Sequence, residues 1–261
     1  MATGYLPQLE DRSFLDSGSA GNFSAPASFT APPSFSLRDA LVVEDQGNMN
    51  SCVGHGASSG MECLQYLKSK TRKPMSRMFA YITAQQQTNI NRDQGATIAG
   101  AAAALSKTGC CFEATFPYPQ HYNRTLPPAA IQEASKYRIL GHRTLTTYEE
   151  ILGWQQAGKG PVLAGTVWTQ RLANNSGTVV TPTDLRGPVV GAHCTLFIGW
   201  NEDGTLDELN SHGTRWGQQG WASWTPEAIT AVLRLRDTVF IGITDITGFD
   251  ETRLYDFRAI V

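Results

Sequence analysis

The sequence is poor in charge, and neither sign of charge dominates it. Charged residues make up 17% of the 261 positions, and the formal net charge is -2. Chains that bind nucleic acid or anionic membranes through electrostatics carry a marked excess of Lys and Arg. We therefore expect neither nucleic acid nor a membrane as the main partner.

Long hydrophobic runs are also missing. The longest apolar stretches have the length of a strand, and the Met1 end lacks a basic segment followed by an apolar core. The sequence thus predicts neither a transmembrane helix nor a secretory signal. A hydrophobic content of 41% still suffices for one large domain or for two lobes that share a core.

Cysteine is scarce and its arrangement suggests no pairing. The count is odd, two cysteines are adjacent, and no Cys-x-x-Cys pair occurs; the residues are Cys52, Cys63, Cys110, Cys111 and Cys194. This usage favours a reducing compartment and folding without disulfides. Cys52 and His55 have a zinc-like spacing, but no further ligand accompanies them, so we expect neither a metal nor a cofactor.

Three polar segments follow one another in an order that suits nucleophilic catalysis. Gln46 stands six residues before Cys52, His193 comes much later, and residues 210–220 read Asn-Ser-x-Gly-x-x-Trp-Gly-x-x-Gly. A thiol attacks as the thiolate and needs a histidine in reach, which in turn needs a polar group to orient its ring. A glutamine side chain near the nucleophile can donate to the oxyanion of a tetrahedral intermediate.

On these segments the chain resembles the papain-like cysteine peptidases, of the bacterial or viral type that lacks the long inhibitory propeptide. The resemblance implies that Cys52 is the nucleophile and His193 the base. By the same resemblance Asn210 orients His193, and Gln46 stabilises the oxyanion. The implied fold is α+β, with a helical N-terminal lobe, an antiparallel β-rich C-terminal lobe and the active site in the cleft between them.

The resemblance also places the substrate. Residues 93–98, Asp-Gln-Gly-Ala-Thr-Ile, resemble the segment that binds the substrate backbone, so Gly95 and Ala96 are expected to offer main-chain hydrogen bonds to an extended peptide. Ala192 would line the pocket for the second residue before the scissile bond. Its neighbours there are small as well, namely Gly165, Gly191 and Cys194. Small walls leave room for a bulky apolar or aromatic side chain.

Two positions depart from the family pattern. Val53 follows the nucleophile where Trp is frequent, and His212 stands two residues after Asn210 where Trp usually shields the Asn–His hydrogen bond. Because histidine titrates near neutrality, His212 is expected to weaken the Asn–His pair or to make it sensitive to pH. Trp216 keeps its place and is expected to cover the pair.

Sequence patterns predict helices first and strands afterwards. Helices are expected from Cys52 to about Lys70, over Ser76–Thr88 and over Thr97–Lys107. Thr147 and Glu150 match a capping box, and residues 201–204 have turn composition. Strands are expected at Tyr137–Leu145, Pro161–Trp168, His193–Trp200 and Leu206–Ser211. The helical lobe then covers about 37–136 and the β-rich lobe about 137–261.

Residues 1–36 form a separate N-terminal arm in this prediction. Within residues 17–36, rich in Ser, Ala, Pro and Gly, phenylalanines recur every six residues at Phe23, Phe29 and Phe35. In an extended chain these rings share one side, since six is a multiple of the strand and the polyproline period. The segment is either a linker or an arm docked on its own fold or on a partner protein.

The leading functional hypothesis is a thiol peptidase that hydrolyses peptide bonds in peptides or proteins through a thioester acyl-enzyme. An alternative keeps the fold in a structural, virion or assembly component with weak or no peptidase activity. A cell-wall amidase also uses Cys and His, but the Gln46 spacing and residues 210–220 argue against it. The expected location is cytoplasmic or virion-associated.

Overall fold

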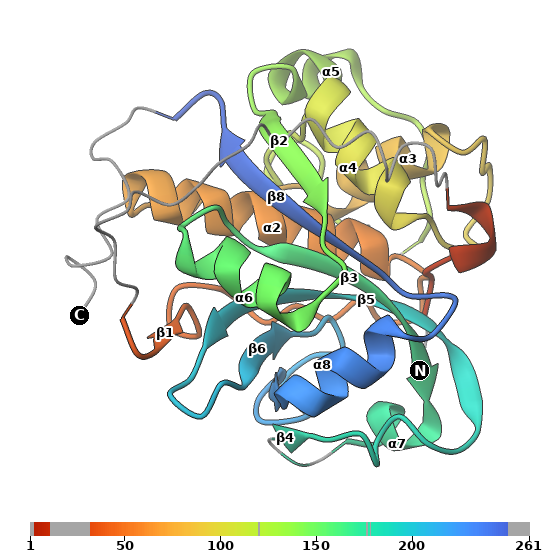
Figure 1. Cartoon of the computed structure of the whole chain (residues 1–261). Coiled ribbons are helices and arrows are strands. Elements are labelled where there is room, and N and C mark those ends of the chain that lie inside the picture. The colour runs from red at the N-terminus through yellow and green to blue at the C-terminus, as the bar shows by residue number, and fades with distance from the viewer. Residues whose placement is uncertain (1–2, 11–31, 120, 176, 178, 250–261) are drawn as a thin grey trace.

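The early helices of the chain lie in the upper half of the view of the computed structural model in Figure 1, and the model describes residues 3–10, 32–119, 121–175, 177 and 179–249. The early helices are α2 (Cys52–Ser69), α3 (Arg77–Gln86), α4 (Ile98–Lys107) and α5 (Pro128–Ala134). Among the described residues, none of the helices has the length and apolar character needed to cross a bilayer.

The later part of the chain builds one sheet with small helices beside it. Its strands are β2 (Ile139–Thr144), β3 (Val162–Thr169), β4 (Val179–Val180), β5 (Val189–Trp200), β6 (Leu206–Leu209), β7 (Trp221–Trp224) and β8 (Val239–Ile246). They lie in the order β2-β8-β3-β5-β6-β7-β4, antiparallel except for β4 with β7. The remaining helices are α6 (Tyr148–Gln156), α7 (Gln170–Ala173) and α8 (Pro226–Leu233). This arrangement confirms the predicted α+β class.

Local capping explains why the predicted helices begin where they do. The side chains of Ser76, Thr97 and Thr147 accept hydrogen bonds from the backbone N–H three residues ahead, at the starts of α3, α4 and α6. Such side chains satisfy donors that have no partner inside the helix. The helix and strand predictions are therefore confirmed to within a few residues, and the structure adds α5, α8 and β8.

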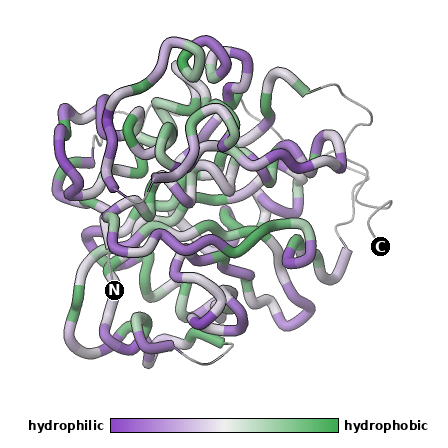
Figure 2. The backbone as a smooth tube through the Cα atoms, turned by 180° about the vertical axis from the view of Figure 1, so that it is seen from behind, coloured by the Kyte–Doolittle hydropathy of each residue, from purple (hydrophilic) through white to green (hydrophobic). Residues whose placement is uncertain are grey.

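The glycines of α2 let other elements approach closely. A Cβ on Gly54 would lie 2.5 Å from the Arg77 carbonyl oxygen, and one on Gly60 would lie 2.8 Å from the Ile243 side chain. The hydrophobic segments, green in Figure 2, run mainly through the middle of the molecule, and hydrophilic ones occupy many outer turns. Three tryptophans are fully buried in this core, Trp168, Trp200 and Trp224.

The expected arm is described only at its two ends. Phe35, in β1 (Phe35–Ser36), is buried, pairs with β5 and stacks on Trp200 with ring centroids 5.1 Å apart. Phe23 and Phe29 lie outside the described residues. Residues 3–10 include the short helix η1 (Pro7–Leu9), and they lie in the region expected to bind substrate.

Candidate active site

Cys52 is the first residue of α2 and is completely buried. Its Sγ accepts a hydrogen bond of 3.3 Å from the backbone N–H of Cys194, which belongs to β5 and follows His193 directly. A helix N-terminus favours a thiolate. Burial has the larger effect here, however, and raises the pKa of the Cys52 thiol to about 12. A lowered pKa, expected from the helix start, is thus not found in this form of the protein.

His193 and Asn210 form the polar pair expected on the β side. The Nε2 of His193 lies 2.8 Å from the Oδ1 of Asn210, and the Ser211 backbone N–H also donates to this Oδ1, at 2.7 Å. Because a backbone N–H can only donate, the shared atom of Asn210 is an oxygen, and Nε2 of His193 carries the proton. His193 Nδ1 is then an acceptor; it is buried and has no hydrogen-bond partner among the described residues.

Gln46 connects the two sides of the site. Its Oε1 accepts from the Ser211 hydroxyl at 2.8 Å, and its Nε2 donates to the Met49 carbonyl at 2.8 Å. The backbone N–H of Gln46 also donates to the Ser211 carbonyl, at 2.9 Å. These bonds fix the side-chain amide of Gln46, whose N–H groups are hydrogen-bond donors, next to the start of α2.

The structure thus brings Cys52, His193, Asn210 and Gln46 into one region, from α2, β5, the end of β6 and the segment before α2. In the described part of the chain, Cys52 and His193 are not hydrogen-bonded to each other. Catalytic hydrogen bonds are often long before substrate binds, so this geometry does not exclude a nucleophile–base pair. Burial, and after it the charge of a protonated His212, lower the pKa of His193 well below its ordinary value.

Aromatic rings enclose His193. Its ring lies 4.7 Å from the ring of Trp168 in β3 and 4.3 Å from that of His212, measured between centroids. Trp216 packs on Trp168 at 6.0 Å, so it shields the site one ring further out than expected. Trp168 was not identified from the sequence. The residue lies within a predicted strand, and no local motif distinguishes it from a core tryptophan.

The main-chain groups expected to bind substrate are occupied by the protein's own N-terminal segment. The Ala96 N–H donates to the Gly4 carbonyl at 2.8 Å, and the Ala96 carbonyl accepts from Leu6 at 2.9 Å. Across the cleft, the Ala192 carbonyl accepts from the N–H groups of Gly4 at 3.3 Å and Tyr5 at 3.2 Å. Residues 3–6 therefore lie between Ala96 and Ala192 as an added strand does.

The Tyr5 side chain fills the pocket predicted from small residues. Tyr5 is only 3% exposed, and a Cβ placed on Gly165 would lie 2.6 Å from its ring and 2.7 Å from Ile98. At the neighbouring position, a Cβ on Gly191 would lie 2.7 Å from the Thr3 hydroxyl. Two of the glycines that suggested a roomy pocket are thus in contact with the segment.

Gly95 differs from the expectation, because its N–H serves the fold. The Gly95 N–H donates to the Tyr81 hydroxyl at 2.9 Å, and its carbonyl accepts from the Gln85 side chain at 2.9 Å. Gly95 instead provides space, since a Cβ there would lie 2.3 Å from the Gly4 carbonyl oxygen. Among the described residues, the main-chain contact with the segment on this side is made by Ala96.

Glu10 anchors the far end of the segment. Its carboxylate accepts from the backbone N–H groups of Ile98 at 2.6 Å and Ala99 at 3.0 Å, the first two residues of α4. These donors have no partner inside the helix, and the helix dipole favours a negative charge at this end. The segment is therefore held by a charged contact as well as by the Tyr5 ring.

The remaining cysteines and His55 lie in the core. The five cysteines are buried free thiols. His55 packs edge-on against Tyr118, and burial lowers its pKa to about 3, so its ring is neutral. Within the described ranges, no group of three or more His, Cys, Asp or Glu could hold a metal ion.

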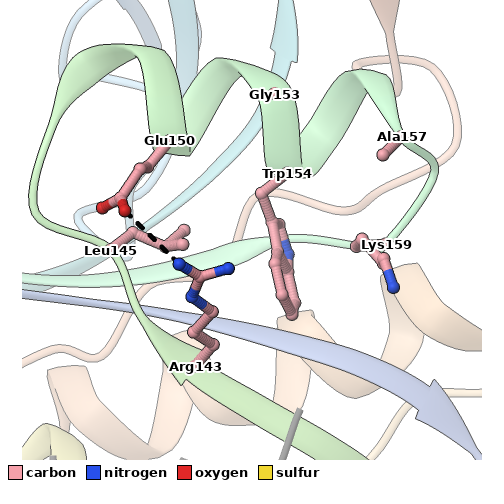
Figure 3. Close-up of a pocket in the computed structure, with 7 residues that line it drawn as sticks. All are labelled: Arg143, Leu145, Glu150, Gly153, Trp154, Ala157 and Lys159. Atoms are coloured by element: carbon pink, nitrogen blue, oxygen red, sulfur yellow. Dashed lines mark hydrogen bonds and ion pairs between the residues drawn. The ribbon is translucent and has the colours of Figure 1, made fainter. Parts of the chain in front are cut away.

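A separate surface pocket of about 200 Å³ lies outside the cleft (Figure 3). Arg143 pairs with Glu150 at its edge, and the Lys159 Nζ lies 5.8 Å from the centre of the Trp154 ring. Partial burial lowers the pKa of Lys159 to about 8. This pocket contains none of the residues predicted to act in catalysis or substrate binding.

Solved structures of several cysteine proteases share the fold of this chain. Among solved structures, xylellain, a cysteine protease from Xylella fastidiosa, is 20% identical with a TM-score of 0.74, covering 94% of this chain and 96% of that chain. Procathepsin B S9 from Trypanosoma congolense is 15% identical with a TM-score of 0.72, covering 94% and 87%. Bromelain from Ananas comosus, in complex with the E64 inhibitor, is 18% identical with a TM-score of 0.63, covering 82% and 99%.

At such identities the structural likeness shows the fold alone. A comparison with curated proteins finds no match. The family profile described as "Papain family cysteine protease" matches residues 31–232, which is most of the chain and includes Gln46, Cys52, His193 and Asn210. The chain therefore belongs to the papain family of cysteine proteases.

Proposed function

We propose that this peptidase is held inactive by its own residues 3–10, and that the segment must leave the cleft before a substrate can bind. One observation carries the proposal: the main-chain groups of Ala96 and Ala192 that would pair with a peptide already pair with Gly4, Tyr5 and Leu6. A substrate cannot form these hydrogen bonds while the segment is present.

Once the cleft is open, each side chain of the site has one chemical role. Cys52 attacks the scissile carbonyl and forms the thioester, and His193 takes the thiol proton on Nδ1 and returns it to the leaving amine. Asn210 keeps the Nε2–H of His193 in place through the 2.8 Å hydrogen bond. The side-chain amide of Gln46, with the Cys52 backbone N–H, stabilises the oxyanion. Water then hydrolyses the thioester with His193 as base.

The state of the thiol supports the blocked form. Cys52 is completely buried, and burial raises its pKa to about 12, so the sulfur carries a proton at neutral pH and is a poor nucleophile. Removing the segment readmits water to the cleft and reduces the desolvation of Cys52. The thiolate then becomes accessible at neutral pH.

The occupant of the pocket points to the preferred substrate. Tyr5 is buried with its ring against Gly165, so the pocket accommodates a tyrosine ring. We therefore expect the open enzyme to prefer substrates with Tyr or Phe as the second residue before the scissile bond. Burial of such a ring contributes about 1.5–3 kcal/mol, so a substrate with Ala at this position should have a kcat/KM lower by roughly 10-fold or more.

The experiment weakens the segment by single substitutions in the full chain. Tyr5→Ala removes the buried ring, and Glu10→Gln removes the charge at α4. Leu9→Ala is the control, because Leu9 belongs to the same segment but its side chain is 42% exposed. The readouts are hydrolysis of a fluorogenic peptide with an aromatic second residue and alkylation of Cys52 by iodoacetamide, followed by peptide mass.

Tyr5→Ala should raise the rates of peptide hydrolysis and of Cys52 alkylation by about 10-fold or more, because the segment loses the free energy of burying the Tyr5 ring. Leu9→Ala should leave both rates unchanged. Glu10→Gln should raise them less, because a half-buried charge at a helix end contributes less than a buried ring. If Tyr5→Ala changes neither rate, the segment does not block the cleft. Faster alkylation without any hydrolysis would instead favour a papain-fold structural component.

A further inference from the structure

His212 lies face-on against the ring of His193. Their centroids are 4.3 Å apart, and the ring planes differ by only 16°. His212 is half-buried, whereas His193 is completely buried between it and Trp168. A proton can therefore reach His212 from solvent, and a charge on its ring would be separated from His193 by a single stacking distance.

Several charged and titratable groups of the described residues lie near His212. The backbone of His212 pairs with that of Asp45, and the Asp45 carboxylate lies beside Gly213. The carboxylate of Glu44, next along the chain, is neutralised by an ion pair with Arg77. His55, on α2, is close enough to be affected by a charge on His212, and it stays neutral because burial lowers its pKa to about 3.

We propose that His212 is a positioning residue whose protonation state controls whether His193 can carry the proton that it takes from Cys52. The proposal rests on the catalytic roles given above to Cys52 and His193. At this position the family usually has a tryptophan, which stays neutral. Here the ring in contact with His193 is a histidine, which can gain or lose a proton.

The coupling follows from the movement of one proton. In the reactive form Cys52 is a thiolate, His193 is an imidazolium and His212 is neutral. When His212 gains a proton, two positive rings face each other at 4.3 Å, and the repulsion between them is strong because one ring is shielded from water. His193 then returns its proton from Nδ1 to the Cys52 sulfur, and the nucleophile becomes a neutral thiol.

The surroundings favour this outcome over a simple loss of structure. The hydrogen bond from His193 Nε2 to Asn210 does not involve the face that stacks on His212, so the pair stays oriented in both states. Burial and a protonated His212 both lower the pKa of His193, so the two rings titrate as a coupled pair. With an uncharged ring at position 212, one of these two effects is absent.

The first test measures alkylation of Cys52 by iodoacetamide from pH 4 to pH 9 in the full chain with the Tyr5→Ala change. Variants with His212→Trp and His212→Gln are compared with the chain that keeps His212. On the acid side, reactivity should fall at a pH at least about one unit higher when His212 is present, as expected for a charge one ring away. With His212→Trp and His212→Gln, the alkylation rate should fall at the same pH on the acid side, even if the two variants differ in maximal rate.

The second test does not depend on thiol reactivity or on peptide hydrolysis. Ring-proton NMR of the unmodified full chain follows the titration of His193 with and without His212→Gln. The replacement should raise the midpoint of His193 by about one unit or more, because it removes the neighbouring charge. A drop in thermal midpoint alone would reflect packing, and it would leave the pH at which His193 titrates unchanged.

The role given to His212 would be overturned by two results together. The alkylation rates of all three chains would fall at the same pH on the acid side, and His212→Gln would leave the pH at which His193 titrates unchanged. A shifted His193 midpoint without measurable peptidase activity would support the coupling and contradict only the catalytic proposal. The two failures can therefore be told apart.

Discussion

The two walls of the cleft hold their catalytic groups by different means. On the helical wall, Cys52 belongs to a helix fixed by close packing, where a Cβ on Gly54 would lie 2.5 Å from the Arg77 carbonyl oxygen. On the β wall, His193 is held by a hydrogen bond to Asn210 and by stacked rings. The helix that carries the thiol is therefore placed by close packing, whereas the ring of His193 is placed by a hydrogen bond and by stacking. In the proposal made for His212, the charge of His193 also responds to pH.

Two buried carboxyl groups, one on each wall, differ in their partners. Glu62 of α2 pairs with Arg72 at 2.6 Å and accepts from the Met75 N–H at 2.9 Å. Glu208 of β6 is completely buried and accepts from the Trp224 indole at 2.6 Å, and its Oε1 has no hydrogen-bond partner among the described residues. Glu208 thus has no cation beside it in the described part of the chain, whereas its neighbour Asp207 pairs with Arg38 at 2.8 Å. We infer that the pH response of the β wall includes the ionisation of Glu208.

The largest effects should come from removing the one reactive group on each wall. In the Tyr5→Ala chain, Cys52→Ala and His193→Ala should each reduce peptide hydrolysis to background, since nucleophile and base act as a unit. The double variant should be no worse than either single one. Initial rates with the fluorogenic peptide measure this, and Leu9→Ala serves as the control for substitution as such.

Substitution of Gln46, whose side chain connects the two walls, should cause an intermediate loss of activity. Gln46→Ala should lower kcat by roughly 10- to 1000-fold, the range for one oxyanion donor, and Asn210→Ala should have a smaller effect than the other three changes. Wild-type rates for Gln46→Ala would contradict the oxyanion role. Rapid alkylation of Cys63 or Cys110 in place of Cys52 would contradict the choice of nucleophile.

The sequence predicts whatever depends on neighbours along the chain. The starts of α3, α4 and α6 follow from the caps Ser76, Thr97 and Thr147, which act within three residues. The order of Gln46, Cys52, His193 and Asn210 can likewise be read directly, since each lies in a short motif. In the structure these four residues come together, and their catalytic roles stay predictions.

Long-range contacts account for what the sequence did not predict. β8 lies between β2 and β3, and its partners are distant in the chain, so no local pattern reveals this central place. Residues 3–10 dock through Tyr5 and Glu10, which no local pattern indicated. Of the phenylalanines expected to dock, Phe35 is buried against Trp200, and the other two lie outside the described residues. The raised pKa of Cys52 results from burial, which depends on the whole fold.

The next prediction tests the buried carboxyl group of Glu208 on the β wall. Burial raises the pKa of Glu208 to about 7, above the value of about 4.3 expected in the unfolded chain. The stability associated with this group is therefore fully present below about pH 4 and is lost as the pH rises through about 7. Glu208→Gln cannot ionise, so relative to wild type it should gain roughly 3 kcal/mol between pH 4 and pH 9.

Urea unfolding at the two pH values measures this difference, with Glu150→Gln as the control of opposite sign. A backbone hydrogen bond from Thr146 lowers the pKa of Glu150, so its stabilisation is present at high pH and is lost on acidification. Glu150→Gln should therefore lose stability relative to wild type as the pH rises. Equal behaviour of the two variants would contradict the opposite pKa shifts of Glu208 and Glu150.

The smallest effect tests the packing of the helical wall with two identical substitutions. Gly54→Ala places a methyl group 2.5 Å from the Arg77 carbonyl oxygen and 2.6 Å from the Tyr81 Cβ, whereas Gly153→Ala in α6 meets no atom within 4 Å. Both changes gain the same helix propensity, about 1 kcal/mol, so the difference between them isolates the clash. Gly153→Ala should stabilise the protein by about that amount, and Gly54→Ala should destabilise it by about 1–3 kcal/mol.

Because α2 begins with Cys52, a displaced helix should also slow alkylation of Cys52 in the Tyr5→Ala chain, which Gly153→Ala should not do. If Gly54→Ala is as stable and as reactive as Gly153→Ala, close packing does not fix the thiol, and both walls depend on polar contacts alone.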